Sequence, residues 1–156
     1  MIFVTVGTHQ QPFDRMLAAI GTLPDLSDVV LQYGYGSPPD GVREAVDFMP
    51  FAEMEHNFER ADAVVTHAGV GSVLCARRSG HVPVVIPRLH ELGEHVDDHQ
   101  AELTRSLAAL GAVLALWPGE DLREALARVP ARSERLAATP GPLTDAVRQA
   151  LGAPPA

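Results

Sequence analysis

The segment Thr66-His67-Ala68-Gly69-Val70-Gly71-Ser72 has the composition of a turn that joins a strand to a helix. Glycines allow the backbone to approach a ligand closely, and a helix N-terminus offers unpaired N–H groups with partial positive charge. Both features suit a diphosphate, and neither needs a lysine. A tight turn that only packs a helix on a strand explains the same residues equally well, because short glycine loops are weak motifs.

A second glycine turn, Gly7-Thr8-His9, follows the first apolar run and adds a hydroxyl and an imidazole. We consider His9 as a catalytic base or a donor of a hydrogen bond to phosphate, and the alternative is a partner-facing or N-terminal loop histidine. Thr8 or Gln11 could instead cap the helix that Pro12 introduces.

The polar stretch between His90 and His99 concentrates histidines and acids. His95 and His99 are four residues apart and would share a face of a helix, so a zinc-dependent hydrolase on His90, His95 and His99 is one reading. The spacing misses the H-E-x-x-H motif by one residue, which argues against a metal site. Asp97 and Asp98 fit better as acids at the start of a helix.

Arg88 follows the fifth apolar run and is a candidate contact for an anion. Arginine supplies all 12 basic residues of the chain, and the absence of lysine excludes P-loop and Schiff-base chemistry. The net charge of -8 argues against nucleic acid as the main partner.

The chain has 156 residues, of which 46% are hydrophobic, and this suits one domain with a real core. A single cysteine, Cys75, excludes a disulfide framework and a cysteine zinc site. No apolar run reaches the roughly 18 residues of a membrane span, and the chain opens on a strand without a basic leader. We therefore expect a cytoplasmic protein whose membrane contact, if any, is peripheral or through a partner.

Apolar runs alternate with helical patterns along the chain. Strands are expected at residues 2–6, 29–33, 45–49, 63–66, 82–86 and 112–116. Helices are expected at residues 13–20, 52–60, 73–79, 96–110, 121–128 and 143–151, with a polar loop at 88–95. We expect one domain over residues 1–151 and a frayed tail at 152–156.

This alternation predicts an α/β fold, a Rossmann-like parallel sheet with helices on both faces and the strand order 3-2-1-4-5-6. The first and fourth strands then flank the switch point, so their two glycine turns meet where ligands bind such sheets. NAD is a poor candidate, because Gly7-Thr8-His9-Gln10-Gln11-Pro12 lacks the dinucleotide fingerprint.

Four segments together resemble one family in order and spacing: Val4-Thr5-Val6-Gly7-Thr8, residues 61–72, Gly80-His81-Val82-Pro83 and Asp98-His99-Gln100-Ala101. The chain is similar to the C-terminal, donor-binding half of family 28 GT-B glycosyltransferases. The likeness covers residues 1 to about 116, and it is strongest to the small stand-alone subunits of two-subunit UDP-N-acetylglucosamine transferases and of bacterial exopolysaccharide assembly.

The resemblance implies which residues hold a UDP-sugar. Gly7 and Thr8 would face the diphosphate, and Phe51 would hold the uracil ring through its backbone. His99 and Gln100 would read the hydroxyls of the donor sugar. The loop and helix start under the diphosphate would comprise His67, Gly69, Val70, Gly71 and Ser72.

One residue departs from the family pattern. A glutamate that binds the ribose hydroxyls usually stands three residues after the position of Ser72, and this chain has Cys75 there. A thiol is a poor partner for a diol, so ribose recognition is weaker, is supplied elsewhere, or the nucleotide differs. Glu91 or Glu94 are candidate substitutes.

The resemblance also implies a split enzyme without a required metal or cofactor. A membrane-associated partner would supply the acceptor site, and the two subunits would carry out inverting sugar transfer. A non-catalytic nucleotide-sugar-binding or regulatory module of the same fold is the main alternative. Every reading must also accommodate self-association through an exposed partner face.

Overall fold

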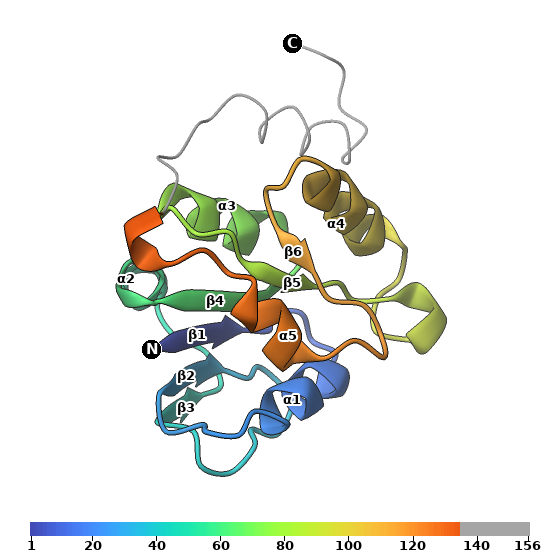
Figure 1. The fold of residues 1–156 in the computed structure, drawn as a ribbon. Helices are drawn as coiled ribbons and strands as arrows, with labels where there is room; N and C mark the ends of the chain where they lie inside the picture. The colour runs from blue at the N-terminus through green and yellow to red at the C-terminus, as the bar shows by residue number, and fades with distance from the viewer. Residues whose placement is uncertain (135–156) are drawn as a thin grey trace.

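The computed structural model describes residues 1–134, and Figure 1 shows six strands stacked side by side in one sheet. All neighbouring strands are parallel, in the order β3-β2-β1-β4-β5-β6, which confirms the predicted topology. The strands are β1 (Ile2–Thr5), β2 (Val29–Gln32), β3 (Glu44–Val46), β4 (Ala63–His67), β5 (Val84–Ile86) and β6 (Leu114–Ala115).

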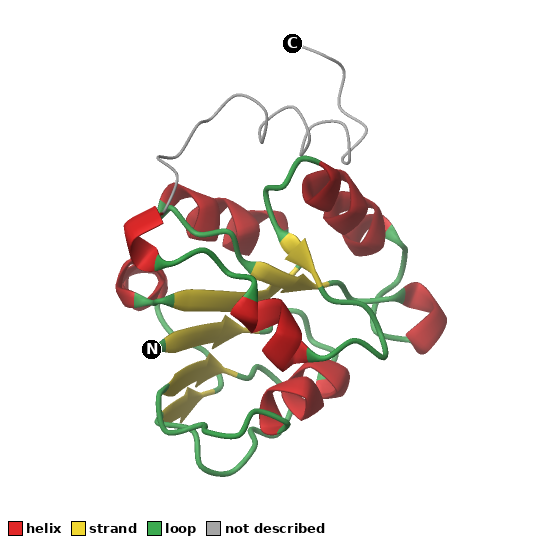
Figure 2. Cartoon of the chain, in the orientation of Figure 1, coloured by secondary structure: helices red, strands yellow, loops and turns green. Residues whose placement is uncertain are grey.

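Five α-helices within the described residues pack on both faces of this sheet (Figure 2). They are α1 (Asp14–Gly21), α2 (Phe51–Arg60), α3 (Val70–Arg78), α4 (His99–Ala109) and α5 (Leu122–Ala127). Two short 3-10 turns, η1 (His90–Leu92) and η2 (Arg132–Glu134), complete the described elements. The predicted helix at 143–151 and tail at 152–156 lie outside the described residues.

Alternating residues of the strands build a core on each face, because successive side chains of a strand point to opposite sides. One core joins α1 and α5 to the sheet through Val4, Leu31 and Val65. On the other face, Phe3, Val30 and Val64 pack under α2 and α3, and Val85 packs under α3 and α4.

Two helix starts differ from the sequence prediction. Helix α3 begins at Val70, three residues before the predicted start, so Gly71 and Ser72 lie in its first turn. Helix α4 begins at His99, three residues after the predicted start, because Asp97 Oδ1 accepts a hydrogen bond from the His99 N–H at 3.0 Å. His95 therefore lies before the helix, and the expectation that His95 and His99 share a helix face is wrong.

Smaller differences occur at other element ends. Helix α2 begins at Phe51 instead of residue 52, and β3 covers Glu44–Val46 instead of residues 45–49. The loop predicted as polar at residues 88–95 contains η1, and it begins with two buried residues, Arg88 and Leu89. These shifts leave the order of strands and helices unchanged.

The two phenylalanines of α2 provide a matched test of this packing. Phe58 is fully buried and its ring contacts the edge of Phe3 at a centroid distance of 5.0 Å, whereas Phe51 is 62% exposed. We expect Phe58→Ala to lower the free energy of unfolding by about 3–5 kcal/mol. Phe51→Ala should change it by no more than about 0.5 kcal/mol. Urea denaturation measures both, and equal losses would contradict this placement of α2.

Candidate functional site

The two glycine turns meet at the carboxyl ends of β1 and β4. These strands pair directly, with Thr5 opposite Thr66, so the turn after each strand lies at the same edge of the sheet. The order of strands reverses between β1 and β4, and open parallel sheets bind ligands at such a point. The structure therefore brings together the two segments that the sequence indicated for a diphosphate.

The imidazole of His67 fills the space between these turns. A Cβ atom added at Gly7 or at Gly69 would overlap the His67 ring, so neither position has room for a side chain. Gly7 also adopts a φ of +79°, which strains any residue with a Cβ. The sequence predicted that His67 contacts the sugar donor. In the structure its ring packs against both turns.

His67 is also an uncharged link. It is only 8% exposed, and burial lowers the pKa of its imidazole to about 4. The positive charge of Arg88 acts in the same direction, while a hydrogen bond to the backbone of Thr5 opposes the shift. The ring is therefore neutral near pH 7. It separates the two turns without repelling the nearby guanidinium of Arg88.

The first turn of α3 presents unpaired backbone donors at the same edge. Gly69 is the N-cap residue and no side chain caps the helix, so the N–H groups of Val70, Gly71 and Ser72 have no intrahelical acceptor. A Cβ added at Gly71 would meet no atom within 4 Å. The fold therefore does not need glycine at position 71, unlike at positions 7 and 69.

The buried amide of Gln32 holds the first turn from the side of β2. Gln32 Nε2 donates to Thr5 Oγ1 at 3.1 Å and to the Gly7 carbonyl at 3.4 Å, and Oε1 accepts from the Met49 N–H at 3.0 Å. Sequence reasoning did not identify Gln32 as part of the site. Its only signal was a polar residue at the end of an otherwise apolar strand.

The loop between β5 and α4 is tied across the site to the segment after β1. Arg15 binds both carboxylate oxygens of Glu94 at 2.8 Å and donates to the Pro87 carbonyl at 2.6 Å. Gln11 Nε2 donates to the Gly93 carbonyl at 3.0 Å. These bonds hold Glu94 beside the site. Both oxygens of its carboxylate already accept hydrogen bonds from Arg15.

Arg88 lies beneath this loop and is buried. Its guanidinium is fully buried, lies 4.5 Å from the ring centroid of Phe13, and donates weakly at 3.4 Å to the carbonyls of Val6, Pro12 and Glu94. The expectation that Arg88 contacts an anion directly is not met by this placement, because protein atoms surround the guanidinium. Its positive charge instead acts on the site at a distance, because it lowers the pKa of both His9 and His67.

The remaining polar residues of the site are grouped around Asp97 and Gln100. Asp97 Oδ1 lies 3.0 Å from His95 Nδ1, and Asp97 Oδ2 lies 3.2 Å from His99 Nδ1. Gln100 Oε1 accepts a hydrogen bond from the Arg88 N–H at 3.0 Å, which places the Gln100 amide at the end of β5. His99 is 66% exposed.

The ring of His9 reaches this group from the turn after β1. The centroids of His9 and His95 are 5.1 Å apart, and His9 Nδ1 accepts a hydrogen bond from the Gln11 N–H at 3.2 Å. Burial, then the charges of Arg88 and His95, lower the pKa of His9. Thr8 is exposed beside it.

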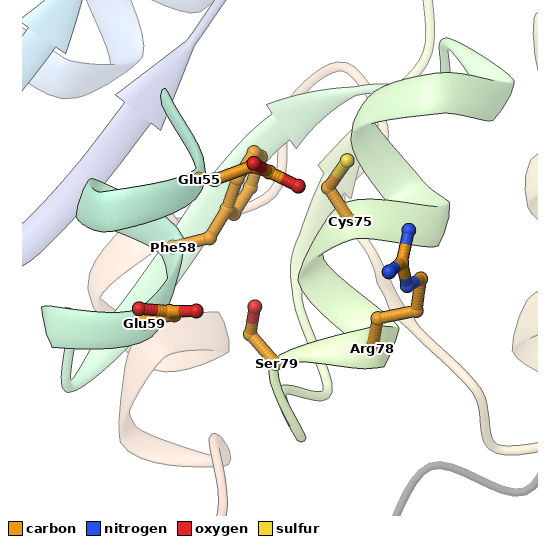
Figure 3. A pocket seen from close by; sticks show the side chains of 6 residues that line it. All are labelled: Glu55, Phe58, Glu59, Cys75, Arg78 and Ser79. Carbon is orange, nitrogen blue, oxygen red and sulfur yellow. The ribbon is translucent and has the colours of Figure 1, made fainter. Parts of the chain in front are cut away.

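Two of the sequence candidates lie apart from this polar group. Phe51 opens α2 with an exposed ring, and exposed Tyr35 and Phe48 contact each other nearby in the chain, with centroids 5.3 Å apart. Cys75 lies on α3, beside a cavity of about 330 Å³ between α2 and α3. Figure 3 shows its other lining residues: Glu55, Phe58, Glu59, Arg78 and Ser79.

The thiol of Cys75 is poorly suited to replace a carboxylate. Burial raises its pKa, with the charge of Arg78 opposing that change, so the thiol stays protonated near pH 7. A neutral thiol is a weak hydrogen-bond partner. Cys75 therefore does not offer the carboxylate chemistry of the glutamate that the family usually has at this position.

Within residues 1–134, no three or more histidine, cysteine, aspartate or glutamate side chains are grouped to hold a metal ion. His90 binds the carbonyl of His95 through Nδ1 at 3.1 Å, while His95 and His99 face a shared carboxylate. The zinc-dependent hydrolase has no ligand set in this part of the chain. The same residues contain no helix that is long and apolar enough to cross a membrane.

A model of the glycosyltransferase family 28 C-terminal domain matches residues 1–142 of the chain. The chain belongs to this family. The match spans both glycine turns and the start of α4, so the family 28 domain includes the whole site described above.

A curated relative is the UDP-N-acetylglucosamine transferase subunit ALG13 of Yarrowia lipolytica. It is 31% identical over 122 residues, which make up 69% of this chain and 60% of that protein. The chain thus spans less than two thirds of the length of this relative.

Two solved structures share the fold. The glycosyltransferase of kitacinnamycin has a TM-score of 0.58 and 24% identity, over 97% of this chain and 39% of that one. CalG4, the calicheamicin glycosyltransferase, has a TM-score of 0.53 and 22% identity, over 96% of this chain and 37% of that one. These likenesses confirm a single Rossmann-like half of the GT-B type.

Substituting the glycines distinguishes those that the fold requires from those that it does not. Gly7→Ala should destabilise the domain by about 2–4 kcal/mol, because the new Cβ is strained at positive φ and overlaps His67. Gly71→Ala is the matched control, and it should be neutral or stabilise by up to about 1 kcal/mol. Chemical denaturation checks both. A Gly7→Ala variant with the free energy of unfolding of the wild type would refute the conclusion that the His67 ring fills the space beside Gly7.

The neutral His67 predicts an acid-sensitive stability. The pKa is about 4 in the folded state and near 6.5 in the unfolded chain, so the unfolded state binds more protons between these values. Stability is complete above about pH 6.5, falls as the pH decreases to about 4, and loses about 3 kcal/mol through this one residue. An NMR titration of the His67 ring measures this directly, and a midpoint near 6.5 would contradict it.

Proposed function

We propose that this chain is the donor-binding subunit of a two-subunit inverting glycosyltransferase. It takes a UDP-sugar and supports transfer of a hexose or N-acetylhexosamine to a lipid-linked or polysaccharide acceptor that a partner binds. The observation that carries the proposal is the meeting of Gly7 and Gly69 at the uncapped start of α3. Membership of family 28 and the name of the Yarrowia relative, a UDP-N-acetylglucosamine transferase subunit, support it.

The diphosphate would lie over the first turn of α3. Unpaired N–H groups and the helix dipole favour two negative phosphates there. The open space above Gly71 permits close approach, and Thr8 adds an exposed hydroxyl from the other turn. The same donors would stabilise the charge that the diphosphate gains when the sugar leaves. This arrangement requires neither a lysine nor, on our proposal, a metal cofactor.

The two ends of the donor would lie on opposite sides of this turn. His99 and Gln100, at the start of α4, would contact the sugar hydroxyls, and Gln100 is already fixed by its bond to the Arg88 backbone. Phe51, at the start of α2, would hold the base through its backbone. With Cys75 protonated, the ribose would receive little help from α3.

The acceptor site belongs, on this proposal, to a second polypeptide. The name of the Yarrowia relative, which describes that protein as a subunit, supports this part of the proposal. A membrane-associated partner would position a lipid-linked or exopolysaccharide acceptor at the carboxyl edge of the sheet, on the cytoplasmic side. Self-association of the chain would compete for that same edge.

A non-catalytic nucleotide-sugar-binding module is the second candidate, and Cys75 is the observation that favours it. Such a module would bind UDP weakly, and a partner would not increase its activity. The donor subunit, in contrast, should bind UDP saturably and gain transferase activity when the acceptor-binding subunit is added.

Calorimetric titration with UDP tests the proposal, with dTDP, GDP and NAD as controls. We expect saturable binding of UDP to the wild-type chain. Gly71→Trp should weaken binding by at least about tenfold, or 1.4 kcal/mol, because the indole covers the first turn of α3. Its thermal unfolding should remain that of the wild type, since the position faces open space.

Ala109→Trp, at an exposed site near the end of α4, controls for the bulk of a tryptophan. It should leave UDP binding unchanged. Equal affinity of wild type and Gly71→Trp would exclude the α3 turn as the diphosphate site. No binding of any nucleotide, alone or with the acceptor-binding subunit, would reject the donor role.

A further inference from the structure

Two imidazoles of the site are held in opposite hydrogen-bonding states. His95 Nδ1 faces a carboxylate oxygen of Asp97 at 3.0 Å, whereas His9 Nδ1 faces the N–H of Gln11 at 3.2 Å. The ring nitrogens of histidine are distinct, and the partner of one sets the protonation of the other. The two rings therefore offer different chemistry to a bound substrate.

For His95 the partner is an acceptor only. The His99 N–H bond, then the charges of His99 and His95, lower the pKa of Asp97, so its carboxylate is ionised and cannot donate. His95 Nδ1 must then carry the proton, and the lone pair of the neutral ring lies on Nε2. The Asp97 N–H also approaches Nδ1, but at 3.4 Å it is the longer contact.

For His9 the partner is a donor. Because Nδ1 accepts the Gln11 N–H, the neutral ring carries its proton on Nε2 and presents an N–H group. Gln11 is itself held by its side-chain bond to the Gly93 carbonyl, which fixes the segment that carries His9. A neutral His9 can donate to an anion but has no lone pair left for a proton from substrate.

Both rings lie where the chemistry would occur. His9 belongs to the first glycine turn, its ring contacts His95, and the charges of both rings act on His67 between the turns. The charged and titratable groups around His95 are Asp97, His99, His90, His9, His67 and the buried Arg88. The side chain of His95 is 17% exposed and that of Asp97 is 38% exposed, so the partly open ring is held by a carboxylate that solvent also reaches.

We propose that His95 is the general base of the transfer, oriented by Asp97, and that His9 donates its Nε2–H to the diphosphate. This inference rests on the proposed function. His95 Nε2 takes the proton of the acceptor hydroxyl as its oxygen forms a bond to the anomeric carbon. The bond from that carbon to the diphosphate oxygen breaks, and its electron pair leaves with UDP. The proton on His95 then passes to solvent.

NMR of the free chain tests the tautomers without any assay of activity. Two-bond couplings in the imidazole rings of ¹⁵N-labelled protein report which nitrogen is protonated. We expect the Nδ1–H form for His95 and the Nε2–H form for His9 when both rings are neutral. The reverse assignment for either residue would overturn the role proposed for it.

Kinetics of the wild-type complex with its acceptor-binding subunit tests the roles. His95→Gln should lower kcat by about 10²–10⁴-fold while UDP affinity stays unchanged. Asp97→Asn should lower kcat and alter the acid-side limb of the pH profile of kcat, because a general base must be unprotonated to act, and a purely structural role would not change that limb. His9→Gln should weaken UDP binding, and His56→Gln, an exposed histidine on α2, is the matched control without effect.

Failure of this inference is distinguishable from failure of the proposed function. A His95→Gln complex that binds UDP and keeps the wild-type kcat would overturn the base role alone. A His9→Gln chain with unchanged UDP affinity would overturn the donor role of His9. Absence of UDP binding in the wild type, measured in the titration above, would instead remove the proposed function itself.

Discussion

The site depends on one packing constraint, which is that a single neutral imidazole fills the space between two glycine turns. His67 at the end of β4 touches the positions of Gly7 and Gly69, so it sets the distance between the turn after β1 and the start of α3. A charged ring would compete with Arg88 for the same region. Burial keeps the ring neutral, so the guanidinium of Arg88 is the cation whose charge acts on this edge of the sheet near pH 7.

Local signals in the sequence were sufficient to predict the strands of the sheet and their order. Short apolar runs, each followed within three residues by glycine or proline, indicated the six parallel strands, and the strand order placed Gly7 beside Gly69. Long-range pairings were not predictable in this way. Arg15 and Glu94 are 79 positions apart, and nothing in either neighbourhood indicates the other. The burial of Arg88 was not predictable either, because its partners are backbone carbonyls, which every residue carries.

The start of α4 shows how one side chain can change both an element and a site. Helical periodicity continues back to Val96, but Asp97 uses its carboxylate on the His99 N–H, and the helix begins there. The same carboxylate faces His95 and His99. Short polar side chains compete with helix formation through such local bonds. A prediction from periodicity alone therefore started α4 three residues too early. It also did not show that the Asp97 carboxylate is shared by His95 and His99.

The cross-links between the loop after β5 and the segment after β1 have a consequence for ligand binding. Arg15 with Glu94 and Gln11 with Gly93 tie these two segments together in the free chain. A ligand that enters does not have to order these segments, so little conformational entropy is lost on association. Preorganisation of this kind would strengthen binding of the donor proposed above without any additional contact.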